Sequence, residues 1–232
     1  MSIPVPSTWA ILPLKQFSDA KRRLSDTLDA QERELLMLAM VRDVLAALAA
    51  CADLAGILIV SRADEAGVLA REFGAEWLRE TAGADLSQAV LEAAAHVERQ
   101  HGARTALVVP GDVPLVSADD VHALLKGHSD VTLVSDGEGV GTNCIVVSPP
   151  TRLQFAFGGA SFPRHVEAAR RSGAEARIVT SPTLALDVDR PEDLKALIER
   201  LPAPHSRTYL DGSGIASRVG GPHNTPSSSA RN

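Results

Sequence analysis

The chain has 232 residues, and 23 Lys and Arg against 29 Asp and Glu give it a formal net charge of −6. This balance argues against nucleic acid as a main partner, because binding to a phosphate backbone is driven by clustered basic side chains. The sequence has no run of about 20 apolar residues and no secretion signal, so we expect a cytoplasmic protein without a membrane segment or membrane partner.

Short apolar runs alternate with longer amphipathic segments along the chain. The apolar runs, which predict strands, cover residues 9–14, 56–60, 105–110, 131–134, 143–147, 176–179 and 184–188. The amphipathic segments, which predict helices, cover residues 29–50, 63–73, 86–100, 117–126, 161–172 and 191–201. This alternation predicts an α/β fold, in which a mostly parallel sheet carries helices on both faces.

Two segments depart from the alternation. The strands expected at 131–135 and 143–148 have no helix between them, which predicts a small antiparallel insertion over the sheet. Residues 202–232 are rich in Pro, Gly and Ser and have little apolar periodicity. We therefore expect a single domain over residues 1–201 and a disordered or loosely attached tail over 202–232.

Basic residues follow the first predicted strand. Ligands of open α/β sheets bind at the carboxyl ends of the parallel strands, and here this region contains Lys15, Lys21, Arg22 and Arg23. These cations could hold a phosphate chain, or the segment could be a solvated basic turn.

Acidic residues follow two later predicted strands. Asp112 lies between two prolines, and the next helix already has Ser117 as its cap, so a role as ligand to a divalent metal is favoured. Asp187 and Asp189 are two residues apart in an extended segment and would project from the same face. Asp187 is favoured as the second metal carboxylate, whereas Asp189 could also form a capping box with Glu192.

Two glycine-containing segments could bind an anion. The glycines of residues 139–143 would let backbone N–H groups converge on a negative charge, although a hairpin turn explains them equally well. Residues 157–162 place a glycine pair before a helix, whose N-terminus attracts anions. Ser161 is the expected cap of that helix.

Several familiar site signatures are missing. The sequence has no P-loop, no dinucleotide-binding glycine motif after the first strand and no nucleophile elbow. Its seven His lack metal-ligand spacing, and His96, His101 and His122 fall on predicted helix surfaces. The two cysteines, Cys51 and Cys144, are too few for a four-cysteine zinc site, so neither a structural metal nor a disulfide is expected.

Taken together, these segments resemble the 2-phospholactate guanylyltransferase family (CofC or FbiD type) of deazaflavin coenzyme F420 biosynthesis. The resemblance rests, in chain order, on W-A-I-L-P-L-K with A-K-R-R-L, A-M-V-R-D-V-L, V-P-G-D-V-P-L, V-G-T-N, F-G-G-A-S-F with His165, and L-D-V-D-R-P-E-D-L. It implies a MobA-like, Rossmann-like nucleotidyltransferase fold, with GTP as cosubstrate and Mg²⁺ as metal. The implied acceptor is 2-phospholactate, phosphoenolpyruvate or 3-phosphoglycerate, and a homodimer is possible.

The matching positions carry roles implied by the resemblance. Asp112, Asp187 and Asp189 match metal carboxylates, and Thr142, Gly158 and Ser161 match positions that hold the acceptor. With Asp112, Lys15 and Lys21 are the expected catalytic residues, and Arg22 and Arg23 are expected to hold the triphosphate. Two positions depart from the family pattern, namely Leu86-Ser87 before the mid-chain helix and Cys144 after Thr142-Asn143.

Two other functions compete with this one. Asp187-Val188-Asp189 spells the D-x-D of metal-dependent glycosyltransferases, although it lies unusually close to the C-terminal helix. A noncatalytic nucleotide-binding module would retain the fold without turnover, and the carboxylates argue against it. Because a phosphate nucleophile is already ionised at pH 7, a guanylyltransferase needs no general base, in keeping with the absence of a His or Glu motif in these segments.

Overall fold

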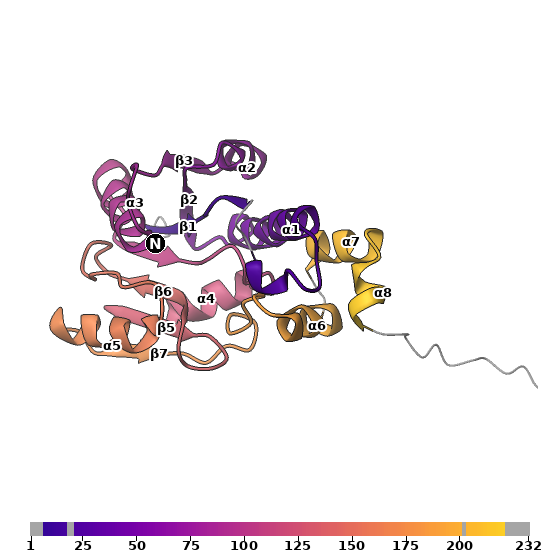
Figure 1. Cartoon of the computed structure of the whole chain (residues 1–232). Helices are drawn as coiled ribbons and strands as arrows, with labels where there is room; N and C mark the ends of the chain where they lie inside the picture. Colours follow the sequence, from indigo (N-terminus) through magenta and orange to yellow (C-terminus); the bar gives the residue numbers. More distant parts are fainter. Residues whose placement is uncertain (1–6, 18–20, 201–202, 221–232) are drawn as a thin grey trace, which may run out of the picture.

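The computed structural model describes residues 7–17, 21–200 and 203–220, which fold around one seven-stranded sheet (Figure 1). The strands lie in the order β3-β2-β1-β4-β6-β5-β7. Their bounds are β1 Thr8–Pro13, β2 Leu54–Ser61, β3 Glu76–Arg79, β4 Thr105–Val108, β5 Val131–Ser135, β6 Thr142–Val147 and β7 Ala176–Ile178. Within the described chain, β6 is antiparallel to its neighbours β4 and β5, and the other pairs are parallel.

The helices cover both faces of this sheet, as the alternating pattern predicts. Their bounds are α1 Ala30–Ala49, α2 Glu65–Phe73, α3 Leu86–His101, α4 Ala118–Lys126, α5 Ser161–Arg171 and α6 Pro191–Arg200. Neighbouring β1 residues point to opposite faces, so Ala10 and Leu12 pack with α1, α2 and α4, whereas Trp9 and Ile11 pack with α3 and α5. The predicted α/β class is therefore confirmed.

Helix α1 shows how the sequence pattern becomes structure. Asp29 caps it by accepting from the Glu32 backbone N–H at 2.8 Å, and the Glu32 carboxylate accepts from the Asp29 N–H at 3.0 Å. This reciprocal capping box satisfies two donors that the first helical turn leaves unpaired. On the inner face, Leu36, Met40 and Val44 are fully buried, as their four-residue spacing predicts.

Three expectations about the sheet are corrected. The antiparallel strand β6 lies within the sheet, between β4 and β5, and not over it. Strand β3 was not expected, because its four residues are only half-buried or exposed at the sheet edge and give a weak apolar signal. The run at 184–188 is not a strand; instead, Val188 N–H donates to the Asp112 carbonyl at 3.0 Å as the chain crosses the end of the sheet.

The expectation of a disordered tail is wrong for residues 203–220. They form α7 Pro204–Gly212 and α8 Ile215–Gly220. The few apolar side chains of this segment, including Leu210 and Ile215, are buried in a third core cluster with residues of α1 and α6. Tertiary packing therefore overrides a composition typical of loops, and residues 221–232 lie outside the described chain.

A buried carboxylate anchors α7 to α1. Asp43, on α1, accepts from the backbone N–H groups of His205 and Ser206, each at 2.8 Å. Both donors belong to the first turn of α7, where no helical partner exists for them. Asp43 thus replaces the N-terminal cap that the sequence of α7 does not supply.

Replacing Asp43 by Ala is expected to lower the free energy of unfolding by about 1–3 kcal/mol, because two buried N–H groups would lose their acceptor. For a chain of this size, the melting temperature should fall by about 2–4 °C per kcal/mol. Thermal denaturation of the variant against Asp119→Ala, at an exposed α4 carboxylate, checks this. Equal melting temperatures for the two variants would show that Asp43 does not hold α7.

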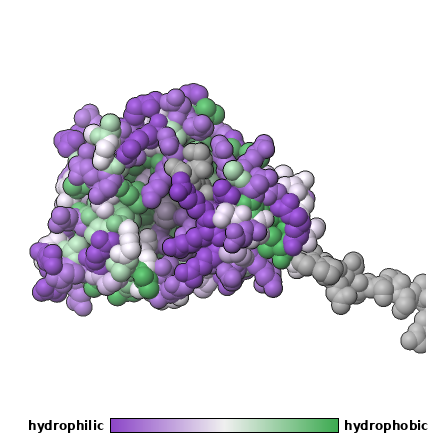
Figure 2. All heavy atoms as spheres, viewed as in Figure 1, coloured by the Kyte–Doolittle hydropathy of each residue, from purple (hydrophilic) through white to green (hydrophobic). Residues whose placement is uncertain are grey.

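No helix within the described residues is both long and apolar enough to cross a bilayer. The face seen in Figure 2 is mainly hydrophilic, with apolar residues gathered toward its middle.

Candidate active site

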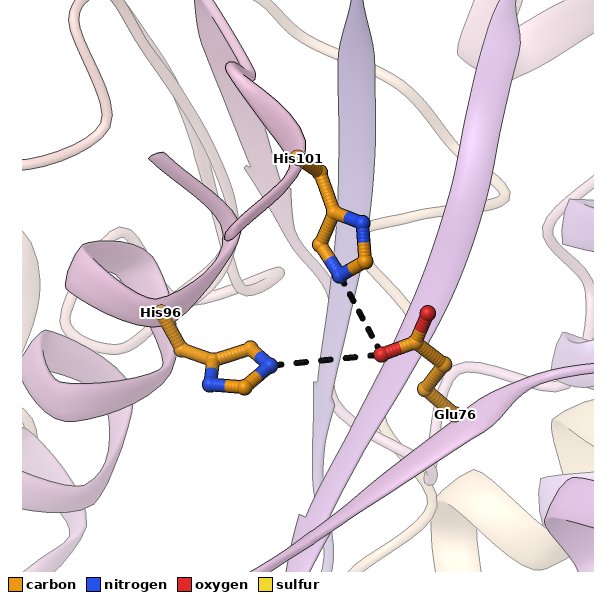
Figure 3. Close-up of side chains that lie close together, drawn as sticks. All are labelled: Glu76, His96 and His101. Atoms are coloured by element: carbon orange, nitrogen blue, oxygen red, sulfur yellow. Dashed lines mark hydrogen bonds and ion pairs between the residues drawn. The ribbon is translucent and has the colours of Figure 1, made fainter. Parts of the chain in front are cut away.

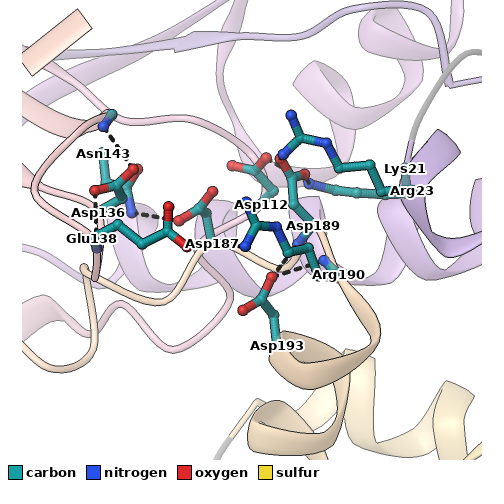
Figure 4. Close-up of polar contacts among 11 residues, drawn as sticks. Lys21, Arg23, Asp112, Asp136, Glu138, Asn143, Asp187, Asp189, Arg190 and Asp193 are labelled. Carbon is teal, nitrogen blue, oxygen red and sulfur yellow. Dashed lines mark hydrogen bonds and ion pairs between the residues drawn. The ribbon is translucent and has the colours of Figure 1, made fainter. Parts of the chain in front are cut away.

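Two acidic segments that are far apart in the sequence meet around one lysine (Figure 4). Lys21 Nζ donates to Asp112 Oδ2 and to Asp189 Oδ1, each at 2.6 Å. Asp112 follows β4 and Asp189 precedes α6, and the backbone bond from Val188 to Asp112 holds these two segments together. The carboxyl end of the sheet therefore gathers a compact cluster of charges.

Lys21 is held tightly in this cluster. Its side chain is only 4% exposed, and its backbone is in the left-handed region with φ 55°. Burial alone would lower the pKa of Lys21, but the charges and hydrogen bonds of Asp112 and Asp189 outweigh it and raise the pKa. The ammonium group thus stays charged at neutral pH. A left-handed lysine costs about 1 kcal/mol or more, which its two ion pairs offset.

The three carboxylates have different surroundings. Burial would raise the pKa of Asp189, but Lys21 lowers it. The pKa of Asp187 is raised by burial and by the negative charges of Asp112 and Asp189, even though Asn143 Nδ2 donates to its Oδ1 at 3.1 Å. Asp187 is thus paired with the neutral amide of Asn143, whereas Asp189 is paired with the ammonium group of Lys21.

This donor set fits a divalent cation of the magnesium type. The oxygens of Asp112, Asp187 and Asp189 are the hard ligands that Mg²⁺ prefers. Lys21 already lies between two of them, at a place where these oxygens favour positive charge. Burial, and then the charges of Asp112 and Asp189, raise the pKa of Asp187, and a bound cation would offset both effects.

A cavity of about 190 Å³ opens beside the charge cluster. It is lined by Asp112 and Asp187 and also by Thr142, Gly158 and Ser161, the residues matched to acceptor binding. These residues come from the loop after β4, from the start of β6, from the loop before α5 and its first residue, and from the segment before α6. The structure therefore brings the proposed metal and acceptor residues to one site.

A second cleft, of about 410 Å³, lies next to the first. Both clefts share Pro13 and Leu86 in their lining, and the second is also lined by Lys15, Arg62 and Glu80. Lys15 therefore borders this cleft and not the carboxylate cluster. Its volume suits a nucleoside, and its position past the ends of β1 and β2 is where α/β sheets bind nucleotides.

The two arginines after Lys21 are exposed on a short 3-10 helix, Arg22–Leu24. Arg23 Nη1 lies 3.8 Å from Asp189 Oδ2, at the outer side of the cluster. Both arginines are thus close to the site without being buried in it.

Ser161 has a different role from the helix cap expected from the sequence. The residue before α5 is Ala160, in the left-handed region with φ 51°, and Ser161 is the first helical residue. The Ser161 hydroxyl accepts from the Thr142 backbone N–H at 2.9 Å. It therefore ties α5 to β6 at the wall of the smaller cavity.

A buried histidine fixes the same wall. Ala156 N–H donates to His165 Nε2 at 2.9 Å, so the ring proton lies on Nδ1, which is 2.9 Å from Thr142 Oγ1 and donates to it. Burial, together with the charge of Arg164, lowers the pKa of His165 to about 4. His165 is therefore a neutral donor that orients the Thr142 hydroxyl.

The glycine-containing loop before β6 is a turn and not an anion site. Asp136 Oδ1 accepts from the N–H groups of Glu138 and Val140, and its Oδ2 accepts from that of Gly141. A Cβ at Gly141 would lie 2.6 Å from Asp136 Oδ2, which explains the glycine. Because these donors are already used, the hairpin-turn alternative is the one that the structure supports.

Two residues at or beside the site were given no role by the sequence. Asn143 donates to Asp187 and, at 2.9 Å, to the Leu184 carbonyl, and its only sequence signal is its place after Thr142. Ser87 Oγ accepts from the Phe157 N–H at 2.9 Å, so this departure from the family pattern anchors the loop before α5. Cys144 lines the smaller cavity, and burial raises the pKa of its thiol.

Comparison with known proteins places this geometry in context. Residues 8–227 match the family model described as "Guanylyl transferase CofC like". The phosphoenolpyruvate guanylyltransferase of Conexibacter woesei is 36% identical over 214 residues, covering 88% of this chain and 96% of the relative. The 2-phospho-L-lactate guanylyltransferase of Methanothermobacter thermautotrophicus is 34% identical over 204 residues, covering 88% and 89%.

A solved structure shares the fold at low identity. A Desulfovibrio desulfuricans protein, assigned provisionally as a nucleotide-diphospho-sugar transferase, matches with a TM-score of 0.72 and 17% identity. The match covers 92% of this chain and 98% of that one. At this identity the similarity concerns the fold alone.

Proposed function

Since this chain belongs to the CofC-like guanylyl transferase family, we propose that it transfers GMP from GTP to the phosphate of a phosphorylated three-carbon acid. The acid is 2-phospholactate, phosphoenolpyruvate or 3-phosphoglycerate, and the product serves deazaflavin coenzyme biosynthesis. The observation that carries this proposal is the cluster of Asp112, Asp187, Asp189 and Lys21 beside the acceptor cavity.

The reaction joins two polyanions, so their repulsion must be cancelled first. Lys21 is close enough to the carboxylates to contact a phosphate group bound there, and Arg22 and Arg23 border the same edge. Lys15 lies toward the larger cleft, which would take the guanosine. These cations would place the triphosphate across the ends of β1 and β4.

Asp112, Asp187 and Asp189 would hold Mg²⁺, which would neutralise the α-phosphate and favour departure of pyrophosphate. Asn143 would keep the Asp187 carboxylate in place through its amide. Lys21 would turn from the carboxylates toward the nucleotide, because these oxygens would then have another cation.

The acceptor would lie in the smaller cavity. The Thr142 hydroxyl accepts hydrogen bonds from His165 and Ser161, so its own proton is free to donate, and Gly158 exposes backbone without a side chain. An oxygen of the acceptor phosphate forms a bond to the α-phosphorus of GTP, while the bond from that phosphorus to the bridging oxygen of pyrophosphate breaks. The attacking phosphate is already ionised, so no side chain has to remove a proton.

Replacing Ser161 by Ala is expected to raise the KM of the acid more than the KM of GTP. The Thr142 N–H would lose its acceptor, so the cavity wall would shift where the acid binds and not where GTP binds. Steady-state kinetics with each substrate varied in turn measure the two constants. Ser172→Ala, at the other end of α5, is the control, and a larger effect on GTP would refute the assignment.

The function is tested by incubating the purified chain with GTP labelled at the α-phosphate, Mg²⁺ and each of the three acids. Transfer of label to an acid with release of pyrophosphate is expected. Release of a nucleoside diphosphate from a sugar nucleotide would instead indicate a glycosyltransferase with the D-x-D segment as its metal site. Binding of GTP without turnover on any acid would indicate a noncatalytic module.

A further inference from the structure

Three potential metal ligands converge away from the candidate active site (Figure 3). Glu76 begins β3, and His96 and His101 lie in the last two turns of α3. Glu76 Oε2 is 3.2 Å from His101 Nε2 and 3.9 Å from His96 Nε2. The three ligand atoms all lie within 4.8 Å of one another.

These distances suit a shared cation. Two ligands of a tetrahedral Zn²⁺, each about 2.1 Å from the metal, lie about 3.4 Å apart. The contact between Glu76 and His101 already meets this spacing, and His96 has to approach the other two ligands by about 1.4 Å at most. The side chains of His96 and His101 are 29% and 24% exposed and that of Glu76 is 48% exposed, so an ion from solvent can reach them.

The orientation of His101 is fixed by its neighbours. Its ring stacks on the Trp9 indole, with centroids 3.9 Å apart and planes at 21°. The indole in turn lies over Gly56, where an added Cβ would come within 2.6 Å of it. A stacked ring loses less freedom on binding a metal, which favours the site.

Glu76, His96 and His101 lie away from the end of the sheet that carries the candidate active site. Glu76 lies at the amino end of β3, and Trp9 lies near the start of β1, whereas the carboxylate cluster follows the carboxyl ends of the parallel strands. Strand β3 is also at the edge of the sheet, where hydrogen bonds hold it from one side only. A metal bound here would fasten this edge strand to the end of α3.

We propose that Glu76, His96 and His101 form a binding site for a divalent transition-metal ion such as Zn²⁺. Two imidazoles and one carboxylate are a donor set that Zn²⁺ accepts, and solvent can fill the fourth position. The role assigned is a structural clamp outside the reaction. The expectation of no structural metal rested on the two cysteines, and no local sequence spacing connects Glu76 with histidines on another element.

An ion pair is the competing explanation, because a protonated imidazole also attracts the Glu76 carboxylate. Calorimetric titration of the full chain with Zn²⁺ distinguishes a metal site from an ion pair. Wild type should bind one ion at this site with an affinity in about the micromolar range. The double variant His96→Ala/His101→Ala and the single variant Glu76→Gln should lose or weaken this binding at least tenfold.

The matched control is His122→Ala, which removes a histidine of α4 that is paired with Asp53, in the turn before β2. It should bind Zn²⁺ as wild type does, and Asp112→Asn should retain the site as well. Zn²⁺ should also raise the melting temperature of wild type and not of the double variant, because a ligand of the folded state stabilises it. The absence of saturable binding in wild type, or unchanged binding in the double variant, would overturn the proposal whatever the enzyme assays show.

Discussion

Asp112→Asn is expected to lower turnover by about 10²-fold or more at saturating Mg²⁺ and GTP, equivalent to about 2.7 kcal/mol of transition-state stabilisation. The amide keeps the size and shape of the side chain but removes one negative charge from the cluster. The backbone carbonyl of residue 112 still accepts from the Val188 N–H, so the contact between the loop after β4 and the segment before α6 should persist. The loss should therefore come from the metal site and not from the fold.

Steady-state turnover and the binding of Mn²⁺, followed by paramagnetic resonance, measure this effect. Mn²⁺ affinity should fall together with turnover. Asp119→Asn, at an exposed carboxylate on α4, provides the control for removal of one negative charge. Wild-type turnover in Asp112→Asn would show that Asp112 is not a metal ligand in the reaction.

Lys21→Met is expected to lower turnover without lowering the affinity for the metal. Turnover should fall by about 10²-fold or more, because the buried cation that we propose to contact the phosphates is lost. Without nucleotide, affinity for Mn²⁺ should rise or stay the same, because the ammonium no longer competes for Asp112 and Asp189. The same two measurements on the variant test both expectations.

Lys195→Met, on the exposed side of α6, is the matched control and should leave both quantities unchanged. The sign of the metal effect distinguishes two roles for Lys21. If Lys21 only stabilised the arrangement of the carboxylates, its loss would weaken Mn²⁺ binding in parallel with turnover. That result would contradict the phosphate-binding role.

Much of the fold follows from local sequence. The four-residue spacing from Leu36 to Val44 and the Asp29 capping residue predict α1, and the apolar run around Ile11 predicts the central strand. Local signals were weakest where structure depends on distant partners. Strand β3 is defined by its pairing with β2, and α7 is capped by Asp43, which lies over 160 residues earlier in the chain.

The candidate site was predictable in its residues and less so in its contacts. Asp112, Asp187 and Asp189 stood out because each follows or ends an apolar run at the expected end of the sheet. The sequence did not indicate that Lys21 would join Asp112 to Asp189, or that Asp189 would not cap α6. Both contacts depend on the path of the chain between these residues. The amide of Asn143 and the tautomer of His165 likewise emerge only from three-dimensional neighbours.

The central claim is that Asp112, Asp187 and Asp189 bind one divalent cation beside the nucleotide. The most direct test is a crystal structure with Mn²⁺ and a GTP analogue that cannot release pyrophosphate, in which anomalous scattering locates the metal. We expect a peak among these three carboxylates, with Lys21 turned toward the phosphates. A nucleotide-bound metal elsewhere, with Lys21 still joining Asp112 to Asp189, would contradict this claim.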